Sequence, residues 1–109
     1  MNEDKKNLRY AVLAVSDRIR QACLAVGDYA KGADKWWGLE KFAIEDVISV
    51  RTVFGDDYVG VQLLLAHEPD IWLCTEFNEL RGWWNGETYT ILVPQEYTAK
   101  IEEYYTKPF

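Results

Sequence analysis

The dipeptide Asn85-Gly86 constrains the fold of this chain more than any other feature of its sequence. Asn-Gly is the preferred pair for a two-residue type I′ turn, because both central residues of that turn need a positive φ. Such a turn fixes the pairing of the flanking strands, so Trp84 is predicted to face Glu87 and Trp83 to face Thr88. The dipeptide therefore predicts a β-hairpin of defined register.

This register assigns the hairpin side chains to two faces, since neighbouring residues of a strand point in opposite directions. The predicted core face is mostly apolar and carries Leu80, Gly82, Tyr89, Ile91 and Val93, with Trp84 closing it near the turn. The outer face is polar apart from one indole and carries Glu79, Arg81, Trp83, Thr88 and Thr90. An exposed ring beside a guanidinium and hydroxyls is typical of a recognition surface. The alternative is an indole that packs under the stem of Arg81.

Two further segments read as helices of ordinary amphipathic type. Residues 8–29 repeat apolar side chains every three to four positions, at Leu8, Val12, Val15, Ile19, Ala22, Val26 and Tyr29. After Pro94, which suits the first turn of a helix, apolar residues recur at Tyr97, Ile101 and Tyr104 or Tyr105. These patterns predict a long N-terminal helix and a shorter C-terminal helix.

A short helix is predicted over residues 33–45. Trp36, Leu39 and Phe42 share one of its faces, and this spacing turns Trp37 away from that face. Trp37 is thus the second tryptophan expected at the surface. If Trp37 and Trp83 shared one side of the fold, they would form an apolar patch of a kind that monomers rarely expose.

Between the second and third helices the hydrophobic period changes to two, which indicates strands. Strands are predicted over residues 47–54, 58–67 and 70–77, and then in the hairpin; whether residues 70–84 form one bent strand or two stays open. The core side of the third strand is expected to carry Ile71, Leu73 and Phe77. The fold class is therefore α+β: a long helix, a short helix, an antiparallel meander of four to five strands and a C-terminal helix, with the helices on one face of the sheet.

The chain has 109 residues, enough for one domain with its own core, and a net charge of −6. The charge is uneven: residues 1–51 carry nine Lys or Arg and eight Asp or Glu, whereas residues 52–109 carry three and ten. An acidic surface repels phosphate backbones and attracts basic proteins, so direct binding to nucleic acid is not expected. No apolar run is long enough for a membrane helix or a signal peptide, and a cytoplasmic location is expected.

No motif in the sequence carries a reaction. His67 is the only histidine and lacks the convergent ligands of a metal site, while Cys23 and Cys74 lie among apolar neighbours and read as buried thiols. Glycine-rich phosphate-binding loops are absent. The chain is therefore expected to be no enzyme and to bind neither metal nor cofactor.

The leading hypothesis is a small acidic binding protein, of inhibitor or immunity type, that occupies a basic surface of a macromolecular partner. The acidic candidates for this surface are Asp56, Asp57, Glu68, Asp70 and Glu79, and the other candidates are Trp83, Arg81, Trp37, Thr88 and Thr90. The alternative is a protein that sequesters an aromatic or nucleotide-like small molecule in an aromatic pocket, in one version between subunits. A third hypothesis is a homo-oligomer in which the exposed tryptophans serve self-association.

Overall fold

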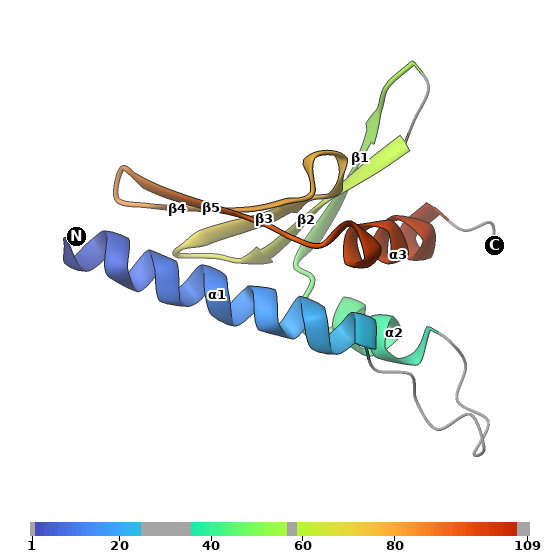
Figure 1. Cartoon of the computed structure of the whole chain (residues 1–109), viewed down its shortest axis with the longest axis horizontal. Helices are drawn as coiled ribbons and strands as arrows, with labels where there is room; N and C mark the ends of the chain where they lie inside the picture. Colours follow the sequence, from blue (N-terminus) through green and yellow to red (C-terminus); the bar gives the residue numbers. More distant parts are fainter. Residues whose placement is uncertain (1, 25–35, 57–58, 107–109) are drawn as a thin grey trace.

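The computed structural model describes residues 2–24, 36–56 and 59–106. Three helices lie on one side of a five-stranded antiparallel sheet, which confirms the predicted α+β class (Figure 1). The helices are α1 (Glu3–Leu24), α2 (Trp37–Glu45) and α3 (Gln95–Thr106). The strands follow each other across the sheet in sequence order: β1 (Ser49–Phe54), β2 (Val59–Ala66), β3 (Asp70–Cys74), β4 (Glu79–Trp84) and β5 (Glu87–Leu92).

Helix α1 lies across β4 and β5 and supplies most of the helical side of the core. The Asn2 side chain caps its first turn, where Oδ1 accepts the backbone N–H of Lys5 at 2.7 Å. The predicted apolar stripe is buried at Leu8, Val12, Val15, Ile19 and Ala22. The final part of the predicted helix, residues 25–29, lies outside the described residues.

The predicted hairpin forms β4 and β5. Trp84 pairs with Glu87, Trp83 with Thr88 and Gly82 with Tyr89, and the turn residues Asn85 and Gly86 have φ of 47° and 79°. Leu80 is fully buried on the helix side, whereas Trp83 is 43% exposed on the opposite side. The register and the outward orientation of Trp83 are both confirmed.

A glycine in β4 allows α1 to approach the sheet closely. A β-carbon at Gly82 would lie 2.7 Å from Cγ2 of Val12 and 2.8 Å from Cδ1 of Leu8. The space above this residue is thus filled by α1, a role that the local sequence does not indicate.

The third strand is shorter than predicted, because β3 ends at Cys74 and a 3₁₀ turn, η2 (Thr75–Phe77), follows it. The Thr75 hydroxyl holds this turn by bonding both the N–H and the C=O of Val61, each at 2.9 Å. Asn78 then reverses the chain with a left-handed φ of 55°. Residues 70–84 are therefore two strands, and Phe77 is 55% exposed, which contradicts its predicted place in the core.

Helix α2 begins at Trp37, and residues 33–35 of the predicted helix lie outside the described part of the chain. Leu39 and Phe42 are buried as expected, and Trp37 is 47% exposed. An ion pair between Arg18 and Asp46, at 3.0 Å, ties the end of α2 to α1. The short helix is thus fixed beside the C-terminal end of the long one (Figure 1).

Candidate protein-binding surface

The outer face of the sheet is the face that the helices leave uncovered (Figure 1). The strand pairing arranges its side chains in rows across the strands. One row contains Leu64, Trp72, Arg81 and Thr90, and the next contains Asp70, Trp83 and Thr88. The outer face thus brings together five of the predicted site residues, Arg81, Trp83, Thr88, Thr90 and Asp70, and Glu79 lies beside them on β4.

Arg81 is held in place on this face by its own neighbours. Its Nε and Nη2 atoms lie 3.3 and 3.4 Å from the carboxylate oxygens of Glu79, and its guanidinium carbon lies 5.0 Å from the ring centre of Phe77. The hydrogen bond to Glu79 raises the pKa of Arg81, with burial opposing it. Because the Glu79 carboxylate neutralises the charge of the Arg81 guanidinium, this ion pair adds no net charge beside Trp83.

Trp72 is a residue of the outer face that the sequence analysis did not single out. The guanidinium carbon of Arg51 lies 5.0 Å from its ring centre, and Nε of Arg51 donates to Oε1 of Gln62 at 2.9 Å. Nε2 of Gln62 in turn donates to Glu76 at 2.5 Å. The signal was present in the sequence, since Trp72 lies between the two core residues Ile71 and Leu73 and must point the opposite way.

A cavity at the end of the sheet joins two turns that are distant in sequence. Because Asp70 pairs with Trp83 across β3 and β4, the β2–β3 turn lies beside the β4–β5 turn, both near the N-terminal end of α1 (Figure 1). The cavity between them, here called the tip cavity, has a volume of about 290 Å³. It is lined by Glu68, Asp70, Trp83, Trp84, Asn85, Gly86 and Glu87.

Two tryptophans and three acidic residues are among the residues that line the tip cavity. The Asp70 carboxylate lies 2.6 Å from Nδ1 of His67, and Oε1 of Glu87 accepts from the side-chain amide of Asn2 at 2.8 Å. Hydrogen bonding between His67 and Asp70 raises the pKa of the imidazole and lowers that of the carboxyl. When His67 is neutral, the described lining of the cavity therefore has three acidic residues, Glu68, Asp70 and Glu87, and no Lys or Arg.

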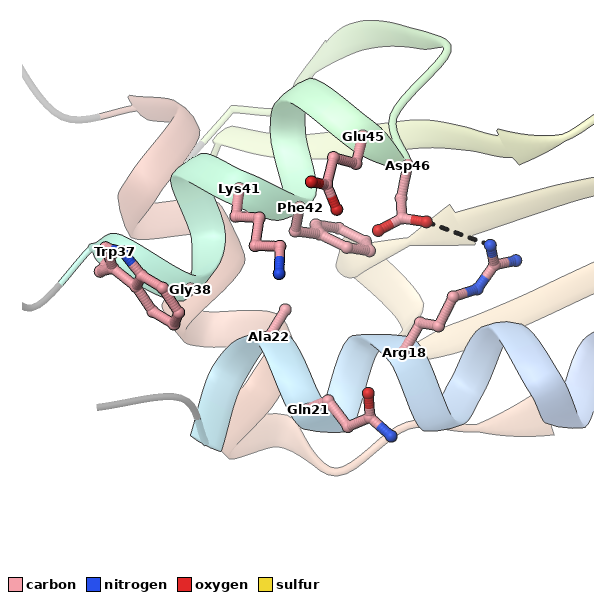
Figure 2. Close-up of a pocket in the computed structure, with 9 residues that line it drawn as sticks. All are labelled: Arg18, Gln21, Ala22, Trp37, Gly38, Lys41, Phe42, Glu45 and Asp46. Carbon is pink, nitrogen blue, oxygen red and sulfur yellow. Dashed lines mark hydrogen bonds and ion pairs between the residues drawn. The ribbon is translucent and has the colours of Figure 1, made fainter. Parts of the chain in front are cut away.

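Trp37 belongs to a different cavity, which lies between α1 and α2 and has a volume of about 360 Å³ (Figure 2). Its lining has mixed charge: Arg18, Gln21, Ala22, Trp37, Gly38, Lys41, Phe42, Glu45 and Asp46. Nζ of Lys41 lies 5.9 Å from the ring centre of Trp37. This cavity is at the C-terminal end of α1, whereas the bond from Asn2 to Glu87 places the tip cavity at the other end. Trp37 and Trp83 therefore do not share a surface.

Among the acidic candidates that the structure describes, Asp56 and Glu79 are not in the lining of the tip cavity. Asp56 is exposed beyond the end of β1, in the β1–β2 hairpin that projects away from the helices (Figure 1). Asp57 lies outside the described residues. The structure thus brings Glu68 and Asp70 to Trp83 but leaves Asp56 and Trp37 elsewhere.

The described residues contain no group of three or more His, Cys, Asp or Glu side chains placed to hold a metal ion. Burial raises the pKa of Cys23 to about 11 and also raises that of Cys74, so neither thiol is activated. Within the same residues no helix has the length and apolar character needed to cross a bilayer. Comparisons with protein-family models, curated proteins and solved structures give no match.

Proposed function

We propose that this protein is a non-catalytic binding protein whose tip cavity receives a basic side chain from a protein partner. One observation carries the proposal: the residues that line this single cavity include two tryptophans, Trp83 and Trp84, and three acidic residues, Glu68, Asp70 and Glu87. The cavity between α1 and α2 and a neighbouring one along α2 each have only one tryptophan, Trp37, in their described lining, together with at least one basic residue.

The chemistry of this lining favours a cation. An ammonium or guanidinium group over an indole gains about 0.5–1 kcal/mol when exposed and about 2 kcal/mol when water is excluded. Carboxylates add charge-assisted hydrogen bonds, and a guanidinium presents several donors in a fixed plane that suits more than one acceptor. Arginine is therefore the side chain that fits best.

The size of the cavity favours one side chain over a whole small molecule. Its volume of about 290 Å³ is at the lower limit of the range found for ligand pockets, about 300–1,000 Å³. The neighbouring outer face offers further contact area, because Thr88 lies opposite Trp83 and Leu92 is 78% exposed on β5. The partner would thus place its basic residue in the tip cavity and rest on the outer face.

The charge of the chain supports the choice of a basic partner. The net charge is −6, and residues 52–109 carry ten acidic side chains against three basic ones. Such a field increases the rate at which a basic surface associates, and added salt reduces that increase. The narrower proposal, an inhibitor or immunity-type protein, rests on this charge and on the small size of the chain.

A second candidate function is the binding of an aromatic or nucleotide-like small molecule between α1 and α2. It is favoured by the larger volume of that cavity, about 360 Å³, and by the indole of Trp37 with the cations Arg18 and Lys41 in its lining. Mass spectrometry of material released from the purified protein tests this candidate. A stoichiometric nucleotide would favour it over the tip cavity, and its absence would leave the tip cavity as the better proposal.

The experiment that tests the main proposal compares two peptides that differ only in the charge of their arginine side chains. Isothermal titration calorimetry would measure the affinity for a short arginine-rich peptide and for the same peptide with citrulline in place of arginine. We expect the arginine peptide to bind at least about tenfold more tightly, and this difference to shrink as salt is added. Equal affinities at low ionic strength would contradict the proposal.

A further inference from the structure

The free edge of β1 is the feature from which we draw a further inference, and it is independent of the tip cavity. Two contacts show which way the backbone of β2 points. The Thr75 hydroxyl bonds both the N–H and the C=O of Val61, so these two backbone groups are directed toward β3. The C=O of Leu64 accepts a hydrogen bond from the N–H of Ile48, so this backbone group is directed toward β1.

The backbone of β1 then follows from its register with β2. Ser49, Arg51 and Val53 pair with Leu64, Gln62 and Gly60, the residues of β2 whose backbone groups point toward β1. Because successive residues of a strand direct these groups to opposite sides, Val50, Thr52 and Phe54 direct theirs to the free edge of the sheet. No strand among the described residues pairs with this edge, so three residues of β1 offer three N–H and three C=O groups to another strand.

The side chains of these same three residues lie on the helix side of the sheet, beyond the reach of the helices. Val50 pairs with Leu63 and Thr52 with Val61, and both of these β2 residues are in the core. Nevertheless Phe54 is 76% exposed and Val50 is 45% exposed, because the β1–β2 hairpin projects past α2 and α3 (Figure 1). The edge therefore combines free backbone groups with apolar side chains.

The usual protections of an edge strand are missing from β1. Its sequence, SVRTVF, has no proline, lysine or acidic residue. The one charged side chain, Arg51, is turned onto the outer face, where it contacts Gln62 and Trp72. Natural proteins protect an exposed edge with charges, proline or a bulge, and an edge without them pairs readily with another strand.

We propose that a second copy of this chain pairs with β1 in an antiparallel register, with Thr52 of both copies facing each other on the two-fold axis. Val50 then faces the partner subunit's Phe54, and Phe54 faces the partner subunit's Val50. Each of these three opposed pairs exchanges two backbone hydrogen bonds. Arg51 faces the partner subunit's Val53, so no like charges are opposed.

The neighbouring registers are poorer. A shift of two residues in one direction leaves only two hydrogen-bonded pairs and sets Arg51 directly against the partner subunit's Arg51, which is destabilising. A shift in the other direction also leaves two such pairs and removes Phe54 from the partner subunit's Val50. The sequence of β1 is therefore complementary to itself in one register.

The surface that this pairing buries is enough for a reversible dimer. Complete burial of a phenylalanine removes about 150–250 Å² from water, and Phe54 is 76% exposed in each copy. Together with Val50, Thr52 and the strand backbone, the total is on the order of 1,000 Å², the lower end of specific interfaces. The dimer should accordingly form and dissociate with concentration.

Sedimentation equilibrium and a cysteine cross-link test this proposal. The mean mass should rise with concentration from 12.7 kDa toward twice that value. Thr52→Cys should form an intermolecular disulfide under mild oxidation, because hydrogen-bonded partners lie about 5.5 Å apart between Cα atoms. Val50→Cys is the matched control, since its counterpart in the other copy lies four residues along the strand and cannot be reached.

Thr52→Pro provides a test that needs no cross-link. The substitution removes an N–H that the sheet of the single chain does not use, and proline is tolerated at such edge positions. We expect the far-ultraviolet circular dichroism to be retained and the association constant to fall at least about tenfold. A constant mass of 12.7 kDa at every concentration, or equal cross-linking of Thr52→Cys and Val50→Cys, would overturn the proposal. Neither result would affect the proposal for the tip cavity.

Discussion

Asp70 and Trp83 lie directly opposite each other on β3 and β4. This one pairing brings the carboxylate that begins β3 to the indole that the type I′ turn sends outward. It also places Glu68 beside Trp84 and Glu87 in the same cavity. The candidate site is thus a consequence of the register of the sheet.

Replacing Trp83 by alanine should weaken binding of the arginine-rich peptide about tenfold, because the face that holds the cation is removed. Stability should fall by about 1–3 kcal/mol without loss of the fold, since Trp83 is 43% exposed and the rest of its surface is buried. Trp37→Ala is the matched control, because Trp37 is 47% exposed and lies at the other end of α1. Titration of both variants by tryptophan fluorescence or calorimetry checks this, and an equal loss in the two variants would be incompatible with a specific role for Trp83.

Protonation of His67 should weaken the same interaction. Asp70 raises the pKa of His67 above its ordinary 6.5, and a protonated imidazole cancels one negative charge of the tip cavity. Affinity for the arginine peptide should therefore fall as the pH is lowered through the raised pKa. The ring-proton shifts of His67 in NMR spectra give that pKa, and Asp70→Asn should move it back toward 6.5. An unchanged pKa in this variant would mean that Asp70 does not hold the imidazole in solution.

The same pair has a defined effect on stability. Because the pKa of His67 is raised in the folded state, its stabilising contribution is complete below 6.5 and is lost as the pH rises through the folded-state pKa. Asp70 has a lowered pKa, so its contribution is lost only as the pH falls through that lower value. The stability difference between the wild type and Asp70→Asn should thus be largest between the two pKa values, as denaturant unfolding at several pH values would reveal.

Gly82→Ala should destabilise the protein by about 1–3 kcal/mol. The added methyl would lie 2.7 Å from Cγ2 of Val12 and 2.8 Å from Cδ1 of Leu8, so these two fully buried side chains would have to shift. Gly86→Ala should cost less, about 1 kcal/mol, because only its positive φ of 79° is unfavourable and no atom lies within 4 Å. Urea unfolding measures both, and a Gly82→Ala variant as stable as the wild type would show that α1 does not pack this closely.

The two cysteines should be unreactive in the folded protein. Both are free and buried, and burial raises the pKa of Cys23 to about 11. At pH 8 a thiol reagent should therefore label neither residue until denaturant is added. Rapid labelling without denaturant would show that the structure around Cys23 or Cys74 opens readily.

Local chemistry explains which parts of the fold the sequence could predict. Asn85-Gly86 specifies a turn whose geometry alone sets the register, so the outward orientation of Trp83 followed from counting residues. The stripe from Leu8 to Ile19 similarly specified the buried side of α1. Phe77 was misplaced because period-two alternation was extended into a 3₁₀ turn, which Thr75 stabilises through a bond to Val61. That bond joins distant residues and has no local signature.

The candidate site could be predicted only in part, because it too depends on contacts between residues that are distant in the sequence. Glu68, Asp70 and Trp83 were each singled out for charge or exposure, but their meeting depends on the pairing of β3 with β4. That pairing requires a chain reversal at Asn78, which the local sequence does not specify. Trp37 met the same criterion of exposure as Trp83, and only the packing of α2 on α1 placed it elsewhere.

The most direct measurement is the detection of intermolecular nuclear Overhauser effects between the arginine side chain of the bound peptide and the indoles of the protein. The chain has five tryptophans, so the indole N–H signals can be assigned one by one with single substitutions. We predict cross-peaks from the arginine δ-protons to the rings of Trp83 and Trp84. Cross-peaks to Trp37 alone, or none to any indole in a saturated complex, would contradict the binding of a cation in the tip cavity.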